Sequence, residues 1–147
     1  MKKNKISFWQ KFIGSFFFLG KIKGGGTWSS IVTGIILYFF LDWNSPHFFI
    51  TAISVLLIGI LLSLNLPGDP SWFTLDEVIG TFMTFAFHNK DASTLIIGLV
   101  LFRLFDIFKL PPLKKVEKTK MGIVMDDVIA GIFASISLFV IYSVKSL

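Results

Sequence analysis

Five of the nine acidic residues in this chain lie inside or directly beside apolar runs. They are Asp76, Glu77, Asp106, Asp126 and Asp127. A carboxylate in membrane-like sequence is costly unless it is paired, binds a cation or lines a wet cavity. These five side chains are therefore the first candidates for function.

Two adjacent acidic pairs, Asp76 with Glu77 and Asp126 with Asp127, each follow a turn near an expected helix start. Neighbouring carboxylates repel one another unless a cation lies between them. Hard oxygen ligands suit Mg²⁺, which keeps several waters and usually binds a substrate phosphate as well. The pairs predict a Mg²⁺ site. The alternative is that each pair caps a helix or forms a salt bridge with lysine.

Arg103, Asp106 and Lys109 follow an i, i+3, i+6 spacing, which places them on one broad helix face. The forked guanidinium of Arg103 could bind a phosphate or hold Asp106 in position. The alternative is a structural ion pair between Arg103 and Asp106 at the membrane interface. The two interpretations are compatible, because an oriented carboxylate can support a neighbouring site.

A glycine-rich turn, Gly24 to Thr27, opens the first long apolar segment and is followed by Ser30. Free backbone N–H groups at a helix start form an anion site, and Lys21 and Lys23 raise the local positive potential. A flexible turn with no chemical role is the alternative. The sequence lacks a G-x-x-x-x-G-K-[ST] pattern, so nucleotide triphosphatase activity is not supported.

The composition is that of an integral membrane protein. The chain has 147 residues, 54% of them hydrophobic, and a mean hydropathy of +0.77, which indicates one membrane domain over residues 1–147. It has no cysteine, which excludes disulfides, thiolate metal sites and cysteine phosphatase chemistry. Its net charge of +5 comes from basic residues that flank apolar segments, so we expect anionic lipid and not nucleic acid as the partner.

The apolar segments predict an all-α membrane bundle of about four to five membrane helices, because no barrel-like alternation is present. A short N-terminal helix over Phe12 to Gly20 is expected to be interfacial or re-entrant, and to be retained because no Ala-x-Ala-like cleavage site follows it. The longer segments are about Trp28 to Leu41, Phe48 to Leu64, Trp72 to Phe87, Leu95 to Phe108, and Gly122 to Val144.

The distribution of lysine predicts the orientation of this bundle. If the N-terminus is cytoplasmic and all five long segments cross, twelve of the fourteen basic residues face the cytoplasm, and only Lys90 and Lys145 lie outside. The same topology places all five candidate carboxylates at the cytoplasmic face. It places His47 and His88 on the opposite side.

Small residues lie one turn beyond the acids, at Gly80, Ala130, Gly131 and Ala134. Small faces let helices approach closely in a membrane. We expect these positions to serve helix packing and to take no direct part in chemistry.

Four motifs in this order resemble the phosphatidylglycerophosphatase A family over about Gly20 to Gly131. The motifs are Gly26-Thr27-Trp28 with Ser30, Asp76-Glu77-x-x-Gly80, Phe102-Arg103-x-x-Asp106-x-x-Lys109, and Gly122-Ile123-x-x-Asp126-Asp127-x-x-Ala130-Gly131. The resemblance implies a Mg²⁺-dependent phosphatase of the bacterial inner membrane, which converts phosphatidylglycerophosphate to phosphatidylglycerol.

The chain departs from the family pattern at a few positions. The first family motif usually has prolines and a Pro-Gly-Thr-x-Gly-Ser core, whereas this chain has Ile22, Gly25 and Ser29. Where the family usually has Lys-Pro after the helix with arginine and aspartate, this chain has Lys109-Leu110. The loop before Gly122 is a few residues shorter than in the family pattern. The acidic and basic positions are intact.

Together these observations predict phosphomonoester hydrolysis at the cytoplasmic membrane face, on an anionic phospholipid. The expected catalytic residues are Asp76, Glu77, Asp106, Asp126 and Asp127, and the expected Mg²⁺ ligands are Asp76, Glu77, Asp126 and Asp127. The expected phosphate-binding residues are Thr27, Ser30, Arg103 and Lys109. Either a water activated by the metal or an aspartate would attack phosphorus.

Two other functions are compatible with buried acids in a membrane protein. A small transporter or ion-conducting subunit would relay cations, but it predicts acids spread through the membrane depth and not gathered at one face. A CDP-alcohol phosphatidyltransferase also uses clustered aspartates and metal. Its D-G-x-x-A-R…D-x-x-x-D signature is missing from this chain.

Overall fold

The structure, a computed structural model, describes residues 6–64, 66, 68–108 and 122–145. The described residues form six α-helices and one short 3-10 helix, without a strand, so the all-helical prediction is confirmed. The helices are α1 (Phe8–Gly14), η1 (Leu19–Lys21), α2 (Gly25–Phe40), α3 (Pro46–Ser63), α4 (Leu75–Phe85), α5 (Ala92–Phe108) and α7 (Gly122–Lys145).

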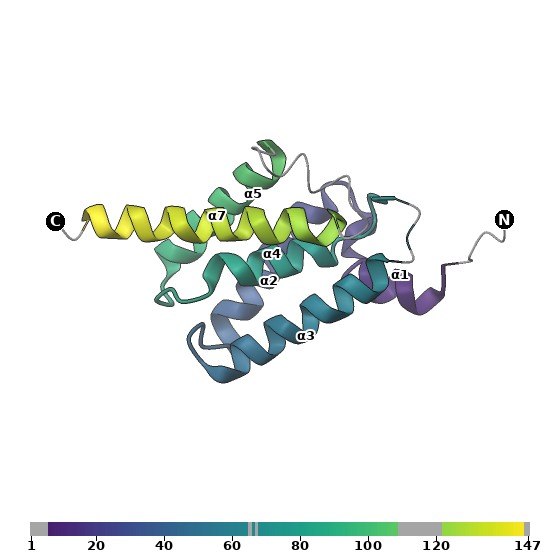
Figure 1. The fold of residues 1–147 in the computed structure, drawn as a ribbon, viewed down its shortest axis with the longest axis horizontal. Coiled ribbons are helices and arrows are strands. Elements are labelled where there is room, and N and C mark those ends of the chain that lie inside the picture. Colours follow the sequence, from purple (N-terminus) through teal and green to yellow (C-terminus); the bar gives the residue numbers. More distant parts are fainter. Residues whose placement is uncertain (1–5, 65, 67, 109–121, 146–147) are drawn as a thin grey trace.

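The short helix α4 is the core of the bundle. It packs against α2, α3, α5 and α7, and nine of its eleven residues are buried. In Figure 1, α7 lies along the long axis of the molecule, with α5 and α3 on opposite sides of it. Because α4 begins at Leu75, it carries Asp76 and Glu77 into the interior of the bundle.

Helices α4 and α7 approach each other closely through glycine. A Cβ atom added at Gly131 would overlap the carbonyl oxygen of Gly80. One added at Gly80 would overlap the ring of Phe102 and lie 2.8 Å from the carbonyl oxygen of Asp127. The expectation that these small residues serve packing is confirmed, and the contact brings the first turns of both helices together.

We expected the N-terminal apolar run to form one helix over Phe12 to Gly20. In the structure this run is instead divided between α1 and η1. Phe16, Phe17 and Phe18 have φ values of 46°, 57° and 68°, in the left-handed region that ends a right-handed helix. The Ser15 hydroxyl oxygen accepts the Phe18 N–H at 3.0 Å and stabilises this turn. Local hydrogen bonding therefore overrides the apolar pattern.

By length and composition, two helices of the described chain are long and apolar enough to cross a membrane, namely α3 and α7. The expected four to five membrane helices are not found by this criterion. Helices α2 and α5 have 16 and 17 residues, short of the roughly 20 that a bilayer requires, and α4 has 11 and is buried in the bundle. Large apolar side chains of α3 point outward, at Ile50, Ile53, Leu57 and Leu61.

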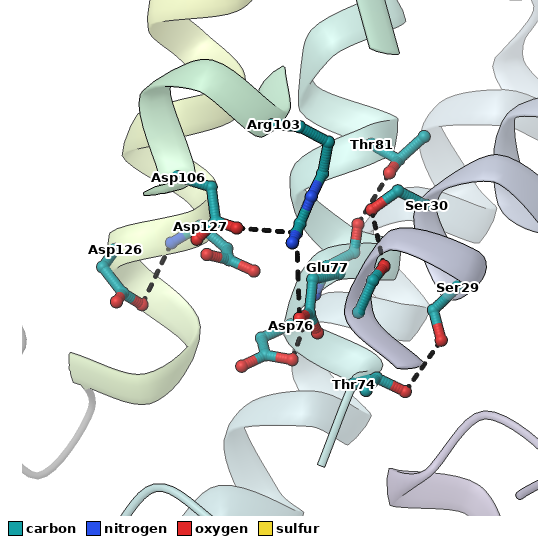
Figure 2. Close-up of polar contacts among 11 residues, drawn as sticks. Ser29, Ser30, Thr74, Asp76, Glu77, Thr81, Arg103, Asp106, Asp126 and Asp127 are labelled. Atoms are coloured by element: carbon teal, nitrogen blue, oxygen red, sulfur yellow. Dashed lines mark hydrogen bonds and ion pairs between the residues drawn. The ribbon is translucent and has the colours of Figure 1, made fainter. Parts of the chain in front are cut away.

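The helices alternate in direction, so chemistry-bearing residues gather at the two ends of the bundle. The N-terminal ends of α2, α4 and α7 and the C-terminal end of α5 meet at one end, which holds all five candidate carboxylates (Figure 2). His88 lies at the other end, where its carbonyl oxygen accepts the Asn44 side-chain N–H at 3.1 Å, and His47 follows close by at the start of α3. The acids and the histidines thus lie at opposite ends of the bundle, while the assignment of these ends to the two sides of a membrane stays a prediction.

Candidate metal and phosphate site

Three carboxylates from two helices meet at one point. One oxygen each of Asp76, Glu77 and Asp127 lies within 4.8 Å of the others. Figure 2 shows them facing one another at the first turns of α4 and α7, beside Arg103. The contact between Gly80 and Gly131 holds these two turns together. The sequence-based expectation that distant acidic pairs converge is thus met by three of the four proposed metal ligands.

Asp126 is not part of this group, contrary to the expectation. Its Oδ1 accepts the backbone N–H of Asp127 at 3.1 Å, and its side chain points away from the other carboxylates (Figure 2). Successive residues on a helix point roughly 100° apart, and here Asp127 faces α4 while Asp126 lies on a different side of α7. The structure gives Asp126 a positioning contact in the first turn of α7.

The three-carboxylate group is buried, and its members repel one another. Asp76 and Asp127 are only 7% and 4% exposed. Burial raises the pKa of Asp76 well above its ordinary value, and the charges of Glu77 and Asp127 raise it further. Burial also raises the pKa of Glu77, while Asp106 and Arg103 act on it in opposite directions. A bound cation would relieve this repulsion.

The donor set fits a hard divalent cation. All three groups offer carboxylate oxygens, the ligand type that Mg²⁺ prefers. The Oε2 atom of Glu77 is buried and has no hydrogen-bond partner among the described residues. A buried carboxylate oxygen without a partner is rare in folded proteins and suggests a ligand.

Arg103 connects the acidic group to α5. Its Nη1 lies 2.6 Å from Asp106 Oδ2 and 3.9 Å from Glu77 Oε1. The predicted pair with Asp106 is therefore present, and the approach to Glu77 is a contact that the sequence did not reveal. The Nε atom of Arg103 is buried and lacks a hydrogen-bond partner among the described residues, so a donor remains for an anionic ligand.

A cavity of about 410 Å³ lies next to the carboxylates. Its wall consists of the segment from Gly20 to Thr27, together with Ser71, Glu77 and Arg103. The segment ends in the first turn of α2, where backbone N–H groups lack intrahelical acceptors, and it carries the exposed cations Lys21 and Lys23. The cavity is thus suited to an anion.

Gly26 lets this glycine-rich turn lie directly against the acidic group. A Cβ atom at Gly26 would overlap Glu77 Oε1. A second contact that sequence reasoning missed joins α2 to the start of α4, where the Ser29 hydroxyl donates to Thr74 Oγ1 at 2.9 Å. The run of three glycines was the only sequence signal for such close packing.

The four expected phosphate-binding residues have different positions. Thr27 and Arg103 line the cavity. Ser30 is fully buried, lies outside the cavity wall and donates its hydroxyl to the Gly26 carbonyl oxygen at 3.0 Å, so the structure does not support its expected role. This back-bonding within a helix is common for serine. Lys109 lies outside the described residues.

Carboxylates from two helices, set against an arginine and a cationic, glycine-rich helix start, are typical of proteins that handle phosphate esters with a metal ion. Here that site sits in an all-helical bundle with a strongly apolar exterior, as expected of a phosphatase that acts on lipids. The family model described as phosphatidylglycerophosphatase A matches residues 12–142, and the chain belongs to this family.

A curated relative agrees with this class. A Bacteroides thetaiotaomicron protein, provisionally named a phosphatidylinositol-3-phosphatase, is 33% identical over 125 residues, which cover 76% of this chain and 79% of the relative. No solved structure matched the chain.

Proposed function

We propose that this protein hydrolyses phosphatidylglycerophosphate to phosphatidylglycerol and phosphate in a Mg²⁺-dependent reaction. Asp76, Glu77 and Asp127 would hold the metal. The observation that carries the proposal is the convergence of these three carboxylates within 4.8 Å, directly beside a cationic cavity. Membership of the phosphatidylglycerophosphatase A family supports the choice of substrate.

The residues of the cavity would bind and orient the phosphate. Arg103, held by Asp106, would neutralise phosphoryl charge, and the Thr27 hydroxyl and first-turn N–H groups of α2 would donate to its oxygens. Bound Mg²⁺ would supply Lewis-acid chemistry, offsetting phosphoryl charge and acidifying water. Hydrolysis joins a water oxygen to phosphorus, breaks the bond from phosphorus to the ester oxygen and leaves the glycerol hydroxyl protonated.

We also propose that the bundle is embedded in a bacterial inner membrane with the acidic end at the cytoplasmic face. Apolar side chains are exposed on α2, α3, α5 and α7, which suits lipid better than water. Helix α1 exposes Phe8 and Trp9, aromatic residues that favour the membrane interface. The positive-inside bias of the sequence supports this orientation.

The name of the curated relative favours a second substrate, phosphatidylinositol 3-phosphate. Both lipids carry a phosphate monoester, so the same carboxylates and Arg103 would act on either. They differ in the alcohol that leaves. Head-group selectivity therefore has to be measured on the purified protein.

The test is phosphate release by the purified protein from both lipids in mixed micelles, with Mg²⁺ and with a chelator. We expect activity only with metal, and a loss of at least about a hundredfold in Asp76→Asn and Asp127→Asn, since even residues that only support metal ligands cost 10–100-fold. Asp42→Asn is the matched control, because Asp42 is exposed in the loop between α2 and α3.

Full activity in both site variants would remove the proposed site. Cation flux into liposomes without phosphate release would favour a transporter.

A further inference from the structure

A second cavity, of about 300 Å³, lies between α2 and α5. Apart from Thr27 and Arg103 at one end, its wall is formed by aliphatic side chains, Ile31 of α2 and Leu99, Val100, Leu104 and Ile107 of α5. Such a surface offers no hydrogen bond to a ligand. It is suited to a hydrocarbon.

This apolar groove borders the polar cavity. Thr27 and Arg103 line both of them. A ligand whose phosphate lies at Arg103 would therefore have its nearest apolar surface in the groove. The arrangement matches an amphiphile with an anionic head and a hydrocarbon tail, which is a lipid phosphate ester.

The groove opens on the outer surface of the bundle. Val100, Leu104 and Ile107 are 54%, 44% and 66% exposed, so a tail lying against them can extend into surrounding lipid. Beyond the end of the groove that is farther from Arg103, α2 and α5 pack tightly at Gly34. A Cβ atom added at Gly34 would lie only 3.1 Å from the side chains of both Leu95 and Leu99. The groove is therefore closed toward the middle of the bundle and open on its outer surface.

We propose that this groove holds one acyl chain of the substrate lipid while its phosphate occupies the cavity lined by Arg103 and the α2 turn. The proposal rests on the proposed function for the reaction at the polar end, and it adds a substrate subsite and an entry route. The lipid would enter sideways from the bilayer, between α2 and α5.

The first test fills the groove. Val100→Trp and Leu104→Trp are assayed on a long-chain diacyl substrate and on a water-soluble short-chain analogue with the same head group. We expect kcat/KM to fall at least about tenfold on the long-chain lipid and to change less than about twofold on the analogue. Ile96→Trp, at an exposed position of α5 outside the groove wall, is the matched control and should keep both activities.

The second test needs no turnover. A lipid phosphate monoester with a photoreactive group in its acyl chain is cross-linked to the protein in micelles, and the labelled peptides are identified by mass spectrometry. We expect label on residues 99–107 and on the start of α2, reduced in Val100→Trp and competed by excess unlabelled lipid. Label that is spread evenly over the outward face of α3 would overturn the subsite.

The two proposals fail in different ways. Absence of phosphate release by the unaltered protein from every lipid ester would overturn the proposed function, whatever the cross-linking shows. An active protein whose tryptophan variants keep full long-chain activity, or lose activity equally on both substrates, would overturn the groove alone.

Discussion

At the scale of single residues, the acidic site combines burial with like charge. Asp76 and Glu77 both have raised pKa values, chiefly because burial disfavours their charged forms. An acid with a raised pKa in the folded state binds more protons there than in the unfolded chain. Without metal, its contribution to stability is therefore present at low pH and is lost as the pH rises through the folded pKa.

This linkage predicts that Mg²⁺ stabilises the protein more as the pH rises. A cation replaces the protons on the carboxylates, so the metal-induced increase in Tm should be larger at mildly alkaline than at mildly acidic pH. The metal-induced increase in Tm is measured by thermal unfolding in detergent with and without Mg²⁺ at several pH values. Asp76→Asn should weaken the pH dependence. A metal-induced shift that is the same at every pH would contradict the raised pKa values.

At the scale of secondary structure elements, the contact between α4 and α7 decides whether the site exists. Asp76 and Glu77 meet Asp127 only because Gly80 and Gly131 let the two helix backbones touch. No other helix pair supplies carboxylates to the group that the described residues form. The site is thus a product of helix packing.

Gly131→Ala is therefore expected to impair both stability and metal binding. The added methyl group would overlap the Gly80 carbonyl oxygen, and overpacking of this kind costs about 1–3 kcal/mol. We expect a lower Tm and a smaller stabilisation by Mg²⁺, measured by thermal unfolding. Ile132→Ala, next in sequence but exposed, is the control and should keep the Mg²⁺ response. An unchanged response in Gly131→Ala would argue against this packing role.

The sequence predicted that the apolar segments form helices, but it predicted less well where each helix begins and ends and which helix is buried. The segment Trp72 to Phe87 became α4 over Leu75–Phe85, because the turn before it extends further than its apolar composition suggests. Its role as the buried core helix was not foreseen, since an apolar run facing lipid and one facing protein have the same composition. The sequence predicted four to five membrane helices, but by length and composition only α3 and α7 of the described helices could cross a membrane.

At the scale of the whole molecule, the alternating helix directions give the bundle one acidic end and one end with histidine. The turn with Lys23 lies at the acidic end, and Asn89 follows α4 at the other. Both residues are exposed. If the bundle spans the inner membrane as proposed, these two positions face opposite compartments.

Single-cysteine labelling tests this orientation directly, because the natural chain has no cysteine. We expect Asn89→Cys to react with a membrane-impermeant thiol reagent added to intact cells. Lys23→Cys should react only after the membrane is opened. Labelling of both positions from outside, or the reverse pattern, would contradict the proposed topology.

The sequence by itself indicated the protein family and the residues expected to carry its chemistry. Carboxylates in apolar sequence are costly wherever they occur, so residue type and context were enough to single out five of them, Asp76, Glu77, Asp106, Asp126 and Asp127. Lysine placement and hydropathy predicted that the acids gather at one end. These properties depend on local composition, which a single sequence contains in full.

Only the tertiary structure decided which of the candidates belong together. It left Asp126 outside the carboxylate group and turned the Ser30 hydroxyl to the Gly26 carbonyl, because helix rotation and neighbouring contacts set where each side chain points. It also brought Arg103 beside Glu77 and placed an apolar groove next to it. Such contacts join residues distant in the chain, and no local pattern encodes them.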